Sequence, residues 1–222
     1  MKVRLLVMVA LMALAGAHTK VAAQCKGMIW PEDRKKADEC VAVWGDALKQ
    51  GNYRSATSSI QWMLTNAPNW NTKLYIDAAD IYDKLADKEA DAAKKKVLVD
   101  SLMLIYDMRI KSCNDEANVL NRKVYAMYKY NIKNKEKLAE LLALYDKVFE
   151  LNGNKVSDGN LVAYMTTVKA NQLAFKNVTE DQIFQRYDKI MGIADAKIKG
   201  YQETNKLDDV NKIKSFKDAI DG

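Results

Sequence analysis

The sequence has few prolines and glycines, the residues that interrupt helices. It also has a single histidine, the residue that most often performs acid–base chemistry near neutral pH. It holds two prolines and nine glycines among 222 residues. Proline breaks helices and sheet ladders, so its scarcity predicts long uninterrupted helices. The single histidine, His18, lies in a segment that we expect to be removed. Catalytic arrangements and metal sites that need histidine are therefore excluded from the mature chain.

The N-terminal residues have the pattern of a secretory signal. Two basic residues precede an apolar run of 13 residues, Leu5–Ala17, and small residues stand just before Gln24. The run is shorter than a membrane-spanning helix requires. We expect residues 1–23 to be cleaved. The mature chain is then expected to be exported, periplasmic or associated with the outer membrane, with no transmembrane segment of its own.

The charge balance gives no sign of a nucleic-acid-binding surface. The chain carries 35 basic and 29 acidic residues, and residues 1–23 contain three of the basic residues and none of the acidic ones, which leaves 32 against 29. The remaining lysines alternate with acids, as in Lys133–Glu140. Nucleic-acid binders instead gather their positive charge on one face. We interpret the pattern as a solvated helix surface with local ion pairs and expect no nucleic-acid partner.

Three cysteines, Cys25, Cys40 and Cys113, lie after the expected cleavage point. An oxidising compartment permits one disulfide among them, and three pairings are open. None lies in a CxxC pattern, so we expect neither a zinc site nor a redox site. We favour a structural bridge that involves Cys25, because it would attach the N-terminal segment to the first helices. A lipid anchor on Cys25 is disfavoured, since Gln24 stands where a small residue is required.

The rest of the chain predicts helices throughout and shows no alternating pattern typical of strands. Apolar residues recur at three- and four-residue spacing. Proline and acids suit a first helical turn, so the first helix is expected to begin at Pro31. Thr179 and Gln182 form a capping-box pattern, and Gly153 is expected to end a helix. The expected helical segments are Pro31–Gly51, Tyr53–Asn66, Asn71–Lys88, Lys94–Cys113, Ala117–Asn134, Lys135–Gly153, Gly159–Asn177, Thr179–Gln202 and Asp208–Gly222.

The stretch from residue 51 to residue 68 has the spacing of a tetratricopeptide repeat, a helix–turn–helix unit of about 34 residues. Gly51 is the small turn residue and Tyr53 the aromatic residue that follows it. Ala56 is small, so that two helices can approach closely, and Pro68 closes the unit. These four residues predict a repeat architecture, in which stacked helix pairs bury a continuous core.

Later units match this pattern less well. In the second unit the charged stretch Ala86–Lys96 is expected to lengthen the connection between its two helices. In the third unit Gly153 stands in place of the closing proline, and the fourth unit is degenerate.

The chain also resembles exported tetratricopeptide-repeat-like proteins of Bacteroidetes. The resemblance rests on Leu74–Lys111, including its Tyr106-Asp107-Met108-Arg109 segment, and spans Cys40–Tyr201. It implies an all-α fold, a right-handed α-solenoid of helix–turn–helix pairs that faces the periplasm or the outer membrane. The expected organisation is a signal peptide (1–23), an N-terminal segment (24–36), a repeat domain of about four helix pairs (37–205) and a short C-terminal capping helix (206–222).

A partner is expected on the concave wall, which the first helices of such units line. Tyr125, Tyr128 and Tyr130 cannot share one helix face, so at least one should point away from the core. Trp44 and Trp62 are expected in the core, whereas Trp70 is expected to be partly exposed. The candidate partner-binding residues are Thr72, Tyr75, Tyr82, Asp83, Tyr130 and Trp70, with Ala79 on the same wall.

These observations favour a non-catalytic scaffold or adaptor that binds an envelope protein or an extended peptide and needs no cofactor or metal. One alternative is a glycan-binding accessory protein that uses the N-terminal tryptophans. Another is a hydrolase that uses Asp100 and Asp107, but these lie about two helical turns or ~10 Å apart, so structural ion pairing is favoured for them and for Arg109. The Asn152–Asn160 segment lacks calcium-loop spacing and is interpreted as a turn.

Overall fold

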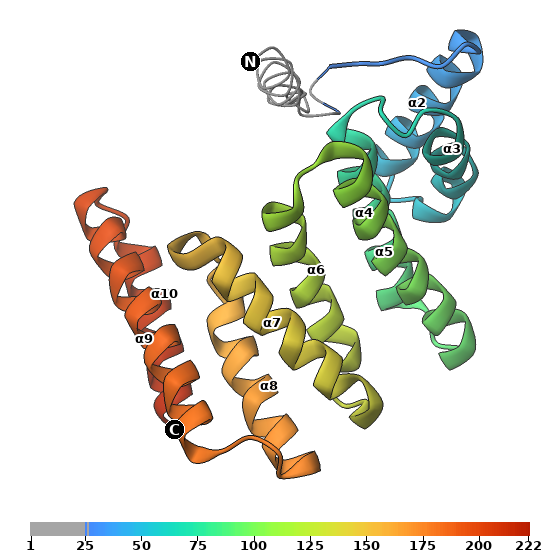
Figure 1. Cartoon of the computed structure of the whole chain (residues 1–222). Helices are drawn as coiled ribbons and strands as arrows, with labels where there is room; N and C mark the ends of the chain where they lie inside the picture. Colours follow the sequence, from blue (N-terminus) through green and yellow to red (C-terminus); the bar gives the residue numbers. More distant parts are fainter. Residues whose placement is uncertain (1–24, 26) are drawn as a thin grey trace, which may run out of the picture.

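The structure, a computed structural model, describes residue 25 and residues 27–222. The signal segment expected for residues 1–23 lies outside the described residues. The described part is all-helical and contains no strand, in agreement with the prediction (Figure 1). Its α-helices are α2 (Arg34–Lys49), α3 (Tyr53–Asn66), α4 (Thr72–Lys88), α5 (Ala92–Cys113), α6 (Glu116–Asn131), α7 (Leu138–Asn152), α8 (Gly159–Phe175), α9 (Glu180–Glu203) and α10 (Leu207–Asp221). Two 3₁₀ turns, η1 (Lys135–Lys137) and η2 (Gly153–Lys155), flank α7.

The helices form a row in chain order, from α2 and α3 at the upper right of Figure 1 to α9 and α10 at its left. Extensive contacts join α2 to α3, α4 to α5 and α6 to α7, in agreement with three of the four expected helix pairs. At the C-terminal end α9 packs more extensively on α10 than on α8, and α10 also contacts α8. The last helix is therefore packed against two helices and closes this end of the row.

The turn between α2 and α3 shows why a glycine stands at residue 51. Gly51 has φ of +67°. Its N–H donates to the carbonyl of Leu48, and the N–H of Asn52 donates to the carbonyl of Ala47. This is the Schellman arrangement, which satisfies the last carbonyls of a helix through a residue in the left-handed region. On the far side of the turn, Ala56 is fully buried at the contact between the two helices.

Two expected helix starts are wrong, and in each case an aspartate explains the difference. Pro31 lies outside α2, because Asp33 is the N-cap and its carboxylate accepts a hydrogen bond from the N–H of Lys36 at 2.9 Å. The expected long connection at Ala86–Lys96 is also absent. Asp91 caps α5 by accepting from the N–H of Lys94, so the helix begins at Ala92, within the charged stretch. In both places the aspartate cap satisfies backbone N–H groups of the first helical turn, so the cap rather than the composition determines where the helix begins.

Other predicted boundaries are confirmed. Thr179 and Gln182 form the capping box at the start of α9. α7 ends at Asn152, and Gly153 follows with φ of +49°. The apolar residues that recur at three- and four-residue spacing on α7 are all buried: Leu138, Leu141, Leu142, Tyr145, Val148 and Phe149.

The buried apolar residues form two clusters rather than one. The first lies among α2, α3, α4 and α5 and includes Ala126 of α6, and the second lies among α6, α7, α8, α9 and α10. Met103 of α5 packs against both clusters. The row is thus held together at its middle by contacts of α5 with α6, beside which the groove described below is formed.

A disulfide joins Cys25 to Cys113 at the end of α5, and Cys40 is buried and unpaired. The chain around Cys25 also bonds to the segment that precedes α4. The backbone N–H and the hydroxyl of Thr72 both donate to the carbonyl of Cys25, and the N–H of Ile29 donates to the carbonyl of Trp70. The N-terminal segment is therefore attached to the start of α4 as well as to the end of α5.

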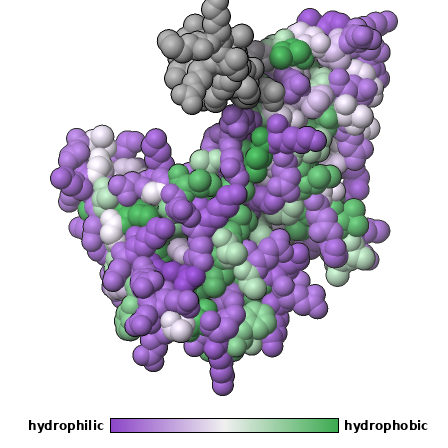
Figure 2. All heavy atoms as spheres, viewed as in Figure 1, coloured by the Kyte–Doolittle hydropathy of each residue, from purple (hydrophilic) through white to green (hydrophobic). Residues whose placement is uncertain are grey.

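Hydrophilic residues cover most of the face shown in Figure 2, with hydrophobic residues scattered among them. Within the described residues, no helix has both the length and the apolar character that a membrane span requires.

Candidate functional site: a groove between α4, α5 and α6

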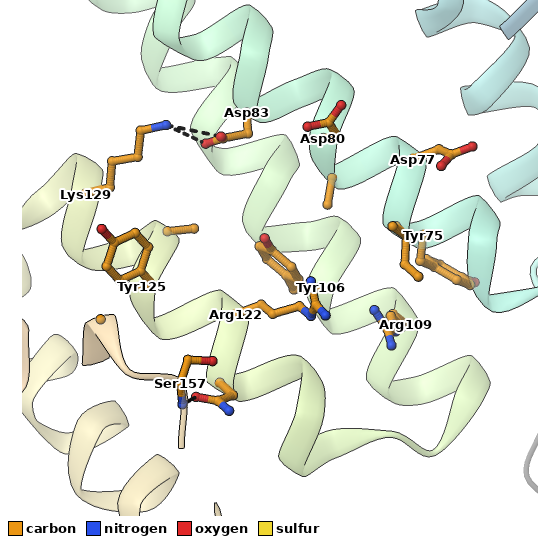
Figure 3. Close-up of a pocket in the computed structure, with 15 residues that line it drawn as sticks. Tyr75, Asp77, Asp80, Asp83, Tyr106, Arg109, Arg122, Tyr125, Lys129 and Ser157 are labelled. Atoms are coloured by element: carbon orange, nitrogen blue, oxygen red, sulfur yellow. Dashed lines mark hydrogen bonds and ion pairs between the residues drawn. The ribbon is translucent and has the colours of Figure 1, made fainter. Parts of the chain in front are cut away.

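A groove of about 620 Å³ opens between α4, α5 and α6 and reaches the start of α8. Figure 3 shows α4 along one side of it and α5 and α6 beneath. Its lining residues are Tyr75, Ile76, Asp77, Ala79, Asp80, Asp83, Tyr106, Arg109, Asn121, Arg122, Tyr125, Ala126, Lys129, Ser157 and Gly159. Most of these residues belong to α4 and α6, with two from α5 and one from α8.

The α4 side of the groove is acidic. Asp77, Asp80 and Asp83 recur every three residues, which places them on one face of the helix. Asp77 is buried, accepts a hydrogen bond from Nε1 of Trp44 at 3.0 Å and pairs with Lys73 at 2.6 Å. Asp80 is exposed and forms neither a hydrogen bond nor an ion pair with any described residue. Of the three carboxylates, that of Asp80 is the one left available to a ligand.

Asp83 belongs to a polar network that ties α4 to α6 at one end of the groove. Nζ of Lys129 lies 3.1 Å from the carboxylate of Asp83 and 2.6 Å from that of Asp87. The hydroxyl of Tyr130 donates to Asp83 at 2.8 Å. Burial acts to raise the pKa of Asp87, but the hydrogen bonds from Lys129 and Tyr130 outweigh it and lower the pKa. Burial and the two carboxylates raise the pKa of Tyr130, which keeps it a donor.

The α5 and α6 side of the groove carries two arginines and a tyrosine, Arg109, Arg122 and Tyr106. Arg109 is only 4% exposed; its Nη2 donates to Asp115, and its Nε has no partner among the described residues. Arg122 of α6 is exposed, forms no ion pair with a described residue and makes one long hydrogen bond, 3.5 Å, to Asn118. Burial raises the pKa of Tyr106, Asp83 adds to this, and Arg122 and Arg109 oppose it.

Tyr125 supplies an exposed ring at the α6 end of the groove. Its side chain is 48% exposed, which confirms that one of the three clustered tyrosines points away from the core. A Cβ atom at Gly159 would lie 3.3 Å from Cε2 of Tyr125. The absence of a side chain at Gly159 therefore gives this ring its place beside the first turn of α8.

The structure brings only some of the predicted partner-binding residues to the groove. Tyr75, Ala79 and Asp83 line it. Thr72 instead bonds to the carbonyl of Cys25, and Tyr130 lies in the network just described. Tyr82 is buried, and its hydroxyl accepts a hydrogen bond from Gln61 at 2.8 Å.

The expectation that Trp70 is partly exposed is wrong. Trp70 is 3% exposed and packs edge-on against Trp30 at 5.4 Å and Trp44 at 5.5 Å between ring centroids. The N-terminal segment held by Cys25 brings Trp30 over it, a contact that no local pattern reveals. Trp44 is buried as expected, and Trp62 is partly buried at the edge of the first cluster.

This packing bears on the glycan alternative, which needs flat aromatic faces open to a sugar. Trp44 and Trp70 are buried. The guanidinium carbon of Arg34 lies 3.7 Å from the ring centroid of Trp30. Three of the four tryptophans therefore pack against one another or against Arg34, which leaves their ring faces covered.

Sequence reasoning missed several groove residues. Ile76 and Asp80 lie on the same helix face as the predicted Tyr75 and Asp83, so the three- and four-residue spacing contained a signal for them. Arg109 was interpreted as a structural ion-pair residue, which describes its bond to Asp115 but not its place in the groove. No local pattern in the sequence indicated that Arg122 would line the groove.

The carboxylates proposed for a hydrolase are engaged elsewhere. Asp100 pairs with Lys96 at 2.6 Å and Asp107 pairs with Lys123 at 2.5 Å. Neither lines the groove. In residue 25 and residues 27–222, no cluster of three or more histidine, cysteine, aspartate or glutamate side chains could hold a metal ion. The Asn152–Asn160 segment forms η2 and the start of α8.

Comparison of the chain with protein-family models, with curated proteins and with solved structures found no match.

Proposed function

We propose that this chain is a non-catalytic adaptor of a bacterial envelope, which holds an extended segment of a partner protein in the groove between α4, α5 and α6. The observation that carries the proposal is that the groove walls offer charged groups of opposite sign that the chain itself leaves unused. Asp80 on α4 and Arg122 on α6 form no ion pair with described residues, although both line the groove. A peptide backbone and its side chains supply partners for both.

The scaffold suits such binding because it is fixed before the partner arrives. Lys129 and Tyr130 link α4 to α6 through Asp83. Met103 of α5 packs against both core clusters, and this packing holds α5 in place next to α4 and α6. A site formed in advance loses less conformational entropy on binding than a site that must be ordered.

The proposal includes a right-handed solenoid of tetratricopeptide-like pairs and a location in the periplasm or at the outer membrane. The glycine turn at Gly51, the buried Ala56 and the chain-order packing of helices support the first part. The apolar N-terminal run and the attachment of Cys25 to Cys113 are consistent with the second. An experimental structure would test the handedness, and fractionation of cells that express the full chain would test the location.

Site-specific photocrosslinking in cells tests the adaptor function directly. A photoreactive residue at Ile76, which is 44% exposed in the groove, is expected to crosslink to one discrete partner. The matched control places the same residue at Leu104 of α5, which is 59% exposed and outside the groove. A second control adds Asp80→Arg to the Ile76 probe, and the crosslink should then weaken. Equal crosslinking at both positions, or none at Ile76, would contradict the proposal.

A further inference from the structure

Arg109 has donor groups that the chain does not use. Its side chain is 5% exposed, and only Nη2 donates, to Asp115. Nε is buried without a hydrogen-bond partner in the described part of the chain. A buried guanidinium N–H without an acceptor is costly, and such groups in folded proteins call for a specific explanation. Because Arg109 lines the groove, a ligand meets the outer nitrogens of its guanidinium group, of which Nη1 donates to no described residue.

Arg122 comes from a different helix and lines the same part of the groove. Tyr106, Arg109 and Arg122 all line the groove, and both guanidinium groups oppose the rise in the pKa of Tyr106. Figure 3 shows Arg122 and Tyr106 between Tyr125 at one end and Tyr75 at the other. Neither Nη atom of Arg122 donates to a described residue. Two arginines with unused donors therefore face one stretch of groove.

We propose that Arg109 and Arg122 form a binding site for the side-chain carboxylate of an aspartate or glutamate in the partner segment. The inference rests on the proposed function, because it names the chemistry that the groove recognises. A guanidinium group presents several N–H donors in a plane and binds carboxylate oxygens with strong, directional hydrogen bonds. Burial of Arg109 strengthens the interaction, because the attraction between opposite charges increases as water is excluded.

The remaining walls determine what stands next to that acidic residue. Ile76 and Tyr125 offer exposed apolar surface, 44% and 48% respectively. Asp80 on the opposite wall attracts a basic side chain and repels a second carboxylate. The preferred segment therefore has one acidic residue with apolar and basic neighbours, and a uniformly acidic segment is disfavoured.

A side chain is favoured over a chain terminus as the source of the carboxylate. Lining residues continue on both sides of Arg122 and Tyr106, towards Tyr75 in one direction and towards Tyr125 in the other. A bound chain that contacts both ends of the groove must continue past the arginines. The carboxylate that reaches them then belongs to an internal residue.

Selection from a display library of short random peptides, with the purified disulfide-bonded protein as bait, tests the inference. Selected peptides are expected to share an acidic residue at a fixed position relative to an apolar one. A synthetic copy with that acid replaced by glutamine should bind about tenfold more weakly or worse, as expected for loss of a charged hydrogen bond. Replacing its free C-terminus by an amide should leave the affinity unchanged.

Variants of the protein provide the reciprocal test. Arg122→Gln should weaken the peptide about tenfold and should not affect folding, because Arg122 is exposed and forms no ion pair with described residues. Arg109→Lys keeps the charge but replaces the planar set of guanidinium donors by one ammonium group, and it should weaken binding severalfold. Lys169→Gln removes one positive charge from an exposed site outside the groove and should leave the affinity unchanged.

The outcomes separate this inference from the function on which it rests. A selection that yields no binders would contradict the adaptor function itself. Binders whose affinity is unaffected by the acid-to-glutamine change or by Arg122→Gln would overturn the carboxylate site while leaving the adaptor function intact. Affinity that is lost with the C-terminal amide would assign the carboxylate to a chain terminus and overturn the side-chain inference.

Discussion

At the scale of single residues, Gly45 and Gly51 show that the same residue type can serve opposite purposes. Gly45 lies inside α2 with helical geometry, and a Cβ atom there would meet nothing within 4 Å. Gly51 follows the same helix with φ of +67°, again with open space around it. Backbone conformation alone therefore distinguishes the two positions, because neither is limited by contacts.

Alanine substitutions at these positions should change stability in opposite directions. Gly51→Ala is expected to lower the free energy of unfolding by about 1 kcal/mol, because the left-handed region disfavours a Cβ atom. Gly45→Ala is expected to raise it by about 0.5–1 kcal/mol, because alanine is the better helix former. Urea denaturation of the two variants and the parent protein measures both changes. Two shifts of the same sign would be incompatible with this account of the turn.

At the scale of elements, charged side chains connect helices at only a few buried positions. Asp158, just before α8, pairs with Lys197 of α9 at 2.9 Å and accepts a hydrogen bond from Tyr201 at 3.1 Å. The side chains of Asp158 and Lys197 are 14% and 10% exposed. This pair therefore contributes to the junction of α8 and α9, where helix packing is less extensive than between α9 and α10. Exposed pairs within one helix, such as Lys96 with Asp100, lack this burial.

Substitution of Asp158 and, in a second variant, of Asp100 should show that the buried ion pair contributes more to stability than the exposed one. Asp158→Ala is expected to lower the free energy of unfolding by about 3 kcal/mol, because Lys197 is left charged and largely buried without its partner. Asp100→Ala, which breaks a pair whose side chains are 75% and 62% exposed, should change it by less than about 0.5 kcal/mol. Denaturant titrations of both variants test this. Similar losses in the two would show that burial does not determine the strength of the pair.

At the scale of the whole molecule, the disulfide closes a long covalent loop in the described chain. Cys25 and Cys113 are 88 residues apart, and the loop between them contains α2, α3, α4 and α5. It also encloses nearly all of the first core cluster. The bridge therefore restricts the unfolded chain over the same residues whose folded packing forms one wall of the groove.

Reduction of the disulfide should lower the free energy of unfolding by about 2–5 kcal/mol, as expected for a bridge that closes a long loop. The measurement is urea denaturation with and without reductant. In a variant with both Cys25→Ser and Cys113→Ser, reductant should have no effect, which distinguishes bridge cleavage from any action on Cys40. An unchanged midpoint in the reduced parent protein would refute the stabilising role.

The sequence determined the helical fold because helix formation depends on local spacing. Apolar residues three and four apart on α7, the capping box at Thr179 and the glycine at residue 51 each act within a few residues, and the structure contains all of them. Local signals failed at Ala86–Lys96, where charge density suggested a loop and the cap at Asp91 instead starts a helix.

The candidate site could be predicted only in part, because it joins residues that are distant in the chain. Tyr75, Ala79 and Asp83 were accessible to prediction, since they share one face of a single helix. Arg109 and Arg122 meet in the groove only through the packing of α5 against α6. The burial of Trp70 depends on Trp30, which is brought there by the Cys25 attachment. The sequence by itself thus determined the helices and their turns, whereas tertiary packing decided which side chains are buried together and which donors remain free for a partner.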